Sequence, residues 1–116
     1  MSGERPGGDL EAQFAALRAE YLVGAPAKMA ELWSCFARVQ NGERGAAPDL
    51  RVLVHRLAGS GGAYGVPAVT ERSRAAEQLI DRIHGAGRAW SAADLEQLRA
   101  HLNGVADAFD RARSTE

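Results

Sequence analysis

Apolar residues recur along the chain at steps of three and four, a spacing that places them on one face of an α-helix. Five such stripes follow one another, and no segment has the alternation typical of a β-strand. The pattern therefore predicts five amphipathic helices. Their apolar stripes are Leu10, Phe14, Leu17 and Tyr21; Met29, Leu32, Phe36 and Val39; Leu50, Leu53, Val54, Leu57, Gly61 and Tyr64; Val69, Ser73, Ala76, Ile80 and Ile83; and Leu95, Leu98, Leu102, Val105 and Phe109.

The segments between the stripes carry residues that end and start helices. These breaks are Gly24 with Pro26, Asn41 with Gly42, the loop NGERGAA before Pro48, Gly65 before Pro67, and the segment GAGR. The fifth helix has the clearest start, because Ser91 and Asp94 form a capping-box-like pair while Trp90 and Leu95 occupy the positions of a hydrophobic staple. Five polar residues are expected on the solvated face of the fourth helix, namely Glu71, Arg72, Arg74, Glu77 and Arg82.

Short loops join neighbouring helices, which must then run antiparallel. The expected fold is all-α, an up-and-down four-helix bundle with an additional short N-terminal helix packed on one end. We expect residues 1–8 to form a flexible N-terminus, residues 9–113 to form the helical domain, and residues 114–116 to form a frayed C-terminus.

The chain has 116 residues and a mass of 12.3 kDa, which allows one domain and excludes a multidomain enzyme. With 46% hydrophobic and 25% charged residues, it is expected to fold as a soluble globule. We expect this globule to be a monomer. Its formal net charge of -1 argues against a nucleic-acid partner. The sequence has neither an apolar run long enough for a membrane span nor the apolar core of a secretory signal, so we expect a cytoplasmic protein without a membrane partner.

Four glycines occupy the last seven positions of the segment HRLAGSGGAYG, which runs from His55 to Gly65 in the third predicted helix. Each interior glycine costs roughly 0.8–1.0 kcal/mol relative to Ala, so this run requires a packing or functional reason. At about 100° per residue, the His55 side chain lies roughly 150° from the centre of the apolar stripe. We therefore expect His55 to face solvent.

The outer face around His55 is expected to be bare. Most of its residues are small or apolar, whereas an ordinary exposed helix face carries Glu, Lys and Gln. This pattern indicates an imidazole that another protein can reach. A plainer interpretation is that the glycines only allow close packing of a neighbouring helix, with His55 an incidental surface residue. The expected docking residues are Arg51, Val52, Arg56, Ala58, Gly59 and Gly62.

The segment HRLAGSGGAYG resembles the signature of the histidine phosphotransfer (HPt) domain family, in which His-x-Leu-Lys-Gly-Ser is followed by small residues and a further Gly. The matching residues are His55 for the phosphorylated histidine, Leu57 for the buried Leu, Gly59 and Ser60 for the Gly-Ser pair, and Gly65 for the closing glycine. Ala58 departs from the pattern, because the family usually has Lys there. The five-helix pattern also resembles this family in size and layout, so residues 9–113 are expected to form an HPt-like domain.

As the resemblance implies, such a domain neither binds ATP nor phosphorylates itself. It accepts a phosphoryl group from a receiver-domain aspartate and passes it to another, so the expected partners are receiver domains of response regulators and of a hybrid sensor histidine kinase. An imidazole of ordinary pKa, near 6.5, is about three-quarters neutral at pH 7 and can then act as a nucleophile. We expect no cofactor on this chain and a metal ion for transfer on the receiver domain.

A second hypothesis is a helical adaptor that docks receiver domains or other signalling partners without phosphotransfer. Ala58 is its best support, because a Lys three residues after His55 would reach back toward the phosphoryl group. Arg51 lies on nearly the same face one turn earlier, but its side chain leans away from His55, so it is expected to be an imperfect substitute. Length and the absence of suitable motifs exclude a kinase with its own ATP site.

Other candidate residues fit structural roles better. His84 precedes a glycine at the predicted end of the fourth helix, where a histidine can meet terminal carbonyls. His101 borders the fifth stripe without an obvious partner. Cys35 lies beside the second stripe as a small buried hydrophobe, and a single cysteine permits no intrachain disulfide. The segment GSGGAYG lacks the Gly-Lys-Ser/Thr ending of a phosphate-binding P-loop.

Overall fold

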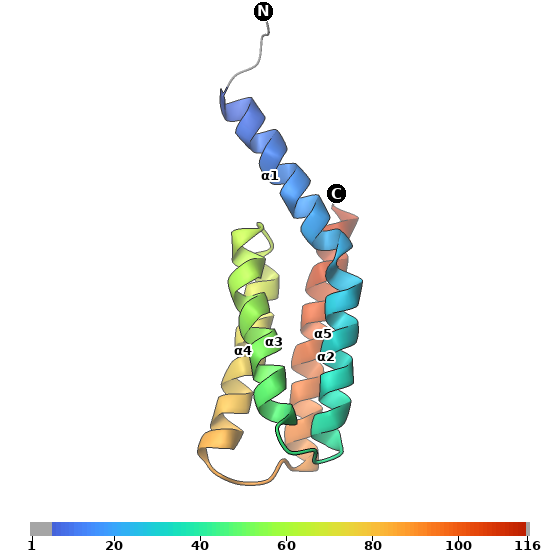
Figure 1. The fold of residues 1–116 in the computed structure, drawn as a ribbon, viewed down its shortest axis with the longest axis vertical. Coiled ribbons are helices and arrows are strands. Elements are labelled where there is room, and N and C mark those ends of the chain that lie inside the picture. Colours follow the sequence, from blue (N-terminus) through green and yellow to red (C-terminus); the bar gives the residue numbers. More distant parts are fainter. Residues whose placement is uncertain (1–5, 116) are drawn as a thin grey trace, which may run out of the picture.

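The computed structural model describes the backbone of residues 6–115 and the side chains of residues 9–115. Within that range the chain contains no strand. The helices are α1 (Pro6–Val23), α2 (Ala25–Gln40), α3 (Ala46–Ala63), α4 (Pro67–Gly85) and α5 (Ala92–Ser114). Helices α2 to α5 lie side by side and alternate in direction (Figure 1). The predictions of an all-α fold and of an up-and-down four-helix bundle are confirmed.

The core lies between α2, α3, α4 and α5 and is supplied by the stripes predicted for these helices. Met29, Leu53, Tyr64 and Leu95 are only partly buried at its edge. Leu79 is fully buried, so the apolar face of α4 is wider than its predicted stripe. Burial of each large aliphatic or aromatic side chain stabilises the fold by about 1.5–3 kcal/mol. The largest fully buried side chains of these helices include Leu32, Leu50, Leu79, Ile80, Ile83, Leu98, Leu102 and Phe109.

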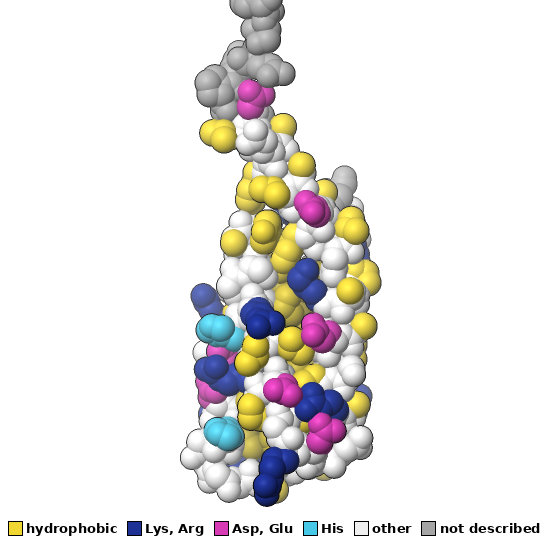
Figure 2. Space-filling model, viewed as in Figure 1, with side chains coloured by type: hydrophobic (Ala, Val, Ile, Leu, Met, Phe, Trp, Pro, Cys, Tyr) yellow, Lys and Arg dark blue, Asp and Glu magenta, His cyan; other side chains and the backbone are white. Residues whose placement is uncertain are grey.

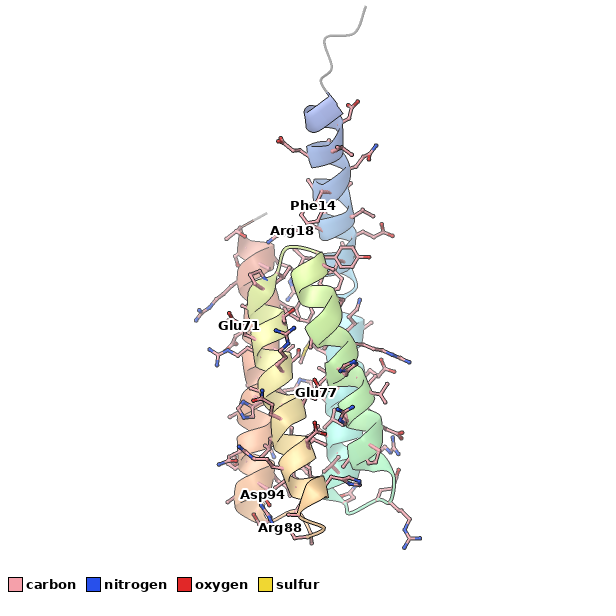
Figure 3. All side chains as sticks on the ribbon, turned by 90° about the vertical axis from the view of Figure 1, so that its left-hand side faces the viewer. Phe14, Arg18, Glu71, Glu77, Arg88 and Asp94 are labelled. Carbon is pink, nitrogen blue, oxygen red and sulfur yellow. The ribbon has the colours of Figure 1, made fainter. Side chains whose placement is uncertain are left out.

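The start of α5 has the predicted capping box. The Ser91 hydroxyl accepts a hydrogen bond from the Asp94 N–H at 3.1 Å, and the Asp94 carboxylate accepts one from the Ser91 N–H at 2.8 Å. Arg88 also donates to both oxygens of this carboxylate, at 2.5 and 3.2 Å (Figure 3). The Arg88 guanidinium and the Ser91 N–H hold the pKa of Asp94 well below its usual range. The link between α4 and α5 is therefore fixed by charge as well as by the cap.

Helices α3 and α4 pack closely where Gly61 faces Thr70. A Cβ atom on Gly61 would lie 2.8 Å from the Thr70 backbone nitrogen, so this position admits only glycine without a shift of the backbone. The Thr70 hydroxyl donates to the Ala58 carbonyl at 2.6 Å and accepts from the Gly62 N–H at 2.7 Å. It thus links the two groups that an uninterrupted α-helix joins directly. The glycine run therefore has a packing role at Gly61.

The ends of the chain differ in part from the prediction. Helix α1 starts at Pro6, before the start predicted near Asp9, so the predicted flexible segment 1–8 is helical from Pro6 onward. Residues 1–5 of that segment lie outside the described residues. At the other end, α5 continues to Ser114, and only residue 116 of the predicted frayed segment lies outside the described residues.

The apolar stripe of α1 faces inward only at the end nearest α2. Tyr21 and Leu22 are buried there. The other residues of the predicted stripe remain largely outside the core, since Leu10, Phe14 and Leu17 are 65%, 44% and 50% exposed. Much of α1 extends past the end of the bundle (Figure 1), and the Phe14 ring lies beside Gly65 in the turn between α3 and α4.

Candidate functional site

His55 lies in the middle of α3, and 67% of its side chain is exposed. The helical projection predicts this orientation. The buried side of the same helix carries Leu57, which is 4% exposed. Packing of α3 through its apolar stripe therefore holds the imidazole at the surface of a rigid helix, where a large partner can approach it.

Glu77 on α4, labelled in Figure 3, is the polar partner of His55. Its Oε2 lies 2.7 Å from Nδ1 of the imidazole, and only 14% of the Glu77 side chain is exposed. An ionised carboxylate can only accept a hydrogen bond, so Nδ1 donates and Nε2 is the unprotonated nitrogen of the neutral ring. This contact selects one tautomer and leaves Nε2 as the nucleophilic atom.

Arg51 and Asp81 extend this pair into a four-residue cluster across α3 and α4. The Arg51 guanidinium lies 3.1 Å from Oε2 of Glu77, the same oxygen that faces His55. It also donates to both oxygens of Asp81, at 2.6 and 3.3 Å. The hydrogen bond from Arg51 lowers the pKa of Asp81, and the same contact raises the pKa of Arg51. Arg51, which was expected to lean away from His55, is thus bound to Glu77, the carboxylate that contacts His55.

The sequence prediction for Glu77 is wrong, because this residue was expected on the solvated face of α4. The register of the α3–α4 hairpin explains its position. The His55–Glu77 and Arg51–Asp81 pairs are separated by 22 and 30 residues, and both are centred on Val66 in the turn. Residues equally far from the turn of an antiparallel helix pair lie at the same level. This symmetry is the sequence signal that could have identified Glu77 and Asp81.

The predicted docking residues divide into two groups. Val52, Arg56, Gly59 and Gly62 are exposed, and Arg51 is partly exposed. A Cβ atom on Gly59 would meet nothing within 4 Å, so the surface one turn after His55 is open. Their exposure agrees with the helical projection, and their role in docking stays a prediction.

Ala58 is the exception among the predicted docking residues. It is only 6% exposed, so its placement on the outer face is wrong. Position 58 follows buried Val54 by four residues and precedes buried Gly61 by three, and it therefore shares their side of α3. Contact with α4 covers this edge of the stripe, since Thr70 binds the Ala58 carbonyl.

A groove between α2 and α3 borders the docking residues. It consists of two adjoining hollows of about 400 and 290 Å³, which share Glu31 and Leu53. Val52 lines one hollow and Arg56 lines the other. On this side of the molecule, apolar side chains are visible between the charged groups (Figure 2). The exposed surface beside His55 thus combines apolar side chains within the groove and charged side chains along its edges.

Ser60 and Gly65 from the sequence motif have structural surroundings. The Ser60 hydroxyl and the Tyr21 hydroxyl are 2.8 Å apart, and the Tyr21 ring stacks on Tyr64 with centroids 4.6 Å apart. Ser60 therefore ties the end of α1 to α3. Gly65 follows α3 with a φ of 75°, a left-handed conformation that favours glycine, and it allows the tight turn into α4.

The other candidate side chains lie away from this cluster or in the core. Cys35 is buried, donates to the Ala46 carbonyl at 3.4 Å and has a pKa raised by burial, which confirms its interpretation as a buried hydrophobe. His84 is exposed at the end of α4. His101 is partly buried on α5, and burial together with Arg72 lowers its pKa.

A comparison with protein-family models identifies the family of the chain. The model described as Hpt domain matches residues 9–108, which is nearly the whole chain. The chain therefore belongs to the Hpt domain family, and this membership supports a histidine phosphotransfer role in phosphorelay and an interaction with receiver domains. Comparisons with curated proteins and with solved structures gave no match.

Two further observations concern the part of the chain that the structure describes. None of its helices is long and apolar enough to cross a membrane. It contains no group of three or more His, Cys, Asp or Glu side chains placed to hold a metal ion.

Proposed function

We propose that this protein relays a phosphoryl group between aspartates of receiver domains through Nε2 of His55. The observation that carries this proposal is the exposed imidazole whose Nδ1 is held by the largely buried Glu77. The partners are receiver domains of response regulators and of a hybrid sensor histidine kinase. The protein acts as a monomeric intermediate in the cytoplasm and has no ATP-dependent kinase activity of its own.

The transfer requires one nucleophilic nitrogen on this chain. The lone pair of His55 Nε2 attacks the phosphorus of an aspartyl phosphate, the N–P bond forms, and the P–O bond to the aspartate breaks with its electron pair on the leaving carboxylate. The ring keeps its proton on Nδ1 and becomes cationic. The Glu77 carboxylate faces that proton and stabilises the charge as it develops. The reverse sequence delivers the phosphoryl group to the next aspartate.

The receiver domain completes the site. The bare surface at Gly59 lets its active-site loops approach within one helical turn of His55, and the groove beside Val52 and Arg56 offers apolar and charged contacts. The metal ion and the remaining charges for phosphoryl transfer come from the receiver. Because an intermediate must release one partner before it serves the next, the complex buries less than about 1,200 Å² and has micromolar or weaker affinity.

Incubation with a labelled phospho-receiver domain tests the proposal. We expect acid-labile, alkali-stable label on the wild type and none on His55→Gln. His84→Gln is the matched control, because it removes another exposed histidine from the same side of the α3–α4 pair and is expected to keep the label. Label that persists in His55→Gln would contradict the assignment.

A phosphorylation-independent adaptor is the second candidate function. The observation that favours it is Ala58, because the family usually has Lys at this position and the alanine supplies no cation. An adaptor would form a stoichiometric complex with a receiver that persists through gel filtration and ignores the phosphorylation state. It would also bind equally well after His55→Gln, which separates it from the relay.

A further inference from the structure

Arg51 shares one carboxylate oxygen with the imidazole of His55. Oε2 of Glu77 lies 2.7 Å from Nδ1 of His55 and 3.1 Å from the Arg51 guanidinium. A carboxylate oxygen that is shared by two positively charged groups attracts each of them less strongly than it would attract one alone. The fixed charge of Arg51 therefore weakens the attraction of Glu77 for a proton on His55. Arg51 therefore influences His55 through Glu77.

Asp81 determines where Arg51 lies. The guanidinium binds both Asp81 oxygens, a two-pronged contact that fixes its orientation. Asp81 follows Glu77 by one turn of α4, and Arg51 precedes His55 by one turn of α3. The two carboxylates would repel each other one turn apart, and Arg51 is the cation that lies between them. If Arg51 were removed, the His55 imidazole would be the group left in contact with Glu77, while His84 lies near Asp81.

Other charged groups on the two helices surround this cluster. On α4, His84 is close enough to act on Asp81, and Arg74 lies one turn before Glu77. On α3, Arg56 is adjacent to His55 in sequence, but it lines the hollow toward α2. Arg51 is thus distinguished from the other cations by its direct contact with the oxygen that binds His55.

We propose that Arg51 is a positioning residue that holds Glu77 and Asp81 and thereby keeps the His55 imidazole neutral. This inference rests on the proposed role of His55 as the phosphoryl acceptor. A protonated imidazole has no lone pair on Nε2, so each protonated molecule is withdrawn from the reaction. Arg51 takes the place in this cluster of a cation that the buried Ala58 does not provide, and it acts from the N-terminal side of His55.

Two measurements on the full chain test Arg51 without any receiver domain. The first is an NMR titration of the His55 imidazole, with nitrogen shifts that report the tautomer. The second is the pH profile of His55 phosphorylation by phosphoramidate, a small donor that needs no docking surface. In that reaction the Nε2–P bond forms, the P–N bond of the donor breaks and ammonia leaves.

Arg51→Gln is expected to move the His55 titration to higher pH and to leave the Nδ1–H tautomer in place, because Glu77 still faces Nδ1. Its phosphorylation rate at pH 7 should fall about two- to fivefold, the effect that a partly exposed ion pair supports, and should recover at alkaline pH. Arg51→Lys should restore most of the wild-type profile, because it keeps the charge beside Glu77. Arg56→Gln is the charge-matched control and should leave the profile close to the wild type.

Asp81→Asn provides a second variant with the opposite sign. Without the Asp81 carboxylate, the Arg51 guanidinium interacts with Glu77 alone and offsets more of its negative charge. The His55 titration should therefore move to lower pH. If Arg51→Gln gives the same titration and pH profile as the wild type or as Arg56→Gln, the role of Arg51 is refuted even when His55 accepts phosphate. Failure of receivers to phosphorylate the wild type would instead refute the proposed function, and the NMR titration would still decide the role of Arg51.

Discussion

Two glycines of α3 that are two residues apart should respond oppositely to the same substitution. A Cβ atom on Gly59 would meet nothing within 4 Å, because Gly59 faces the open surface beside His55. A Cβ atom on Gly61 would lie 2.8 Å from both the backbone nitrogen and the hydroxyl of Thr70, and 3.0 Å from Cβ of Val69. The first position can accept a methyl group, and the second cannot accept one unless α3 and α4 separate.

Helix propensity and packing set the expected magnitudes. Gly59→Ala should stabilise the protein by about 0.8–1.0 kcal/mol, because alanine lowers the entropy cost of an exposed helical position. For a chain of this length, such a gain raises the Tm by about 4 °C. Gly61→Ala has the same gain in propensity, but overpacking against α4 costs about 1–3 kcal/mol. Both substitutions have the same gain in helix propensity. The difference between their changes in the free energy of unfolding therefore measures the packing cost at Gly61.

Thermal and urea unfolding, followed by circular dichroism, provide the assay. Gly62→Ala is a useful third variant, because its Cβ would lie 3.4 Å from the Thr70 hydroxyl and should give a result between the other two. Equal stabilisation by Gly59→Ala and Gly61→Ala would refute the close packing of α3 on α4. A loss of stability in Gly59→Ala would show that Gly59 is not on the open surface assigned to partner docking.

Three other perturbations test separate parts of the account. Gly59→Glu should remain folded yet slow phosphotransfer from a receiver by about tenfold or more, because it places a charged obstacle on the docking surface; an unchanged transfer rate would remove Gly59 from that surface. Ala58→Lys should lower the free energy of unfolding by about 1–3 kcal/mol, because position 58 is buried. Its ammonium should lean toward His55 and make transfer faster and more sensitive to salt, which time courses at two salt concentrations would detect. The lowered pKa of Asp94, caused first by Arg88, contributes stability that is complete above about pH 4 and is lost as the pH falls below it. The stability advantage of the wild type over Asp94→Asn in urea unfolding should therefore shrink below pH 4, and a constant difference down to pH 2.5 would contradict this.

The bundle and the exposure of His55 could be predicted because both depend on periodicity within one helix. The stripes of α2 to α5 are long, and the Ser91–Asp94 capping box fixes the start of α5. The same reasoning placed His55 opposite the stripe of α3. Local patterns of this kind require no knowledge of which helix packs against which.

The partners of His55 could not be predicted from such patterns. Glu77 and Asp81 belong to the next helix, and their contacts depend on the register of the α3–α4 hairpin. Ala58 was misplaced because the width of a buried face depends on how closely the neighbouring helix approaches, which Gly61 determines. The exposed stripe of α1 has a related cause, since an amphipathic pattern does not show where the covering helices end.

A relay between two receiver domains tests the central claim most directly. A labelled phospho-receiver is mixed with this protein and a second, unphosphorylated receiver, and the label is followed from one receiver to the other. The account predicts that the label passes transiently through the wild-type protein to the second receiver, and that His55→Gln abolishes this passage while His84→Gln does not. Label that reaches the second receiver equally well with His55→Gln, or that never leaves the first receiver in the presence of the wild type, would contradict a relay through His55.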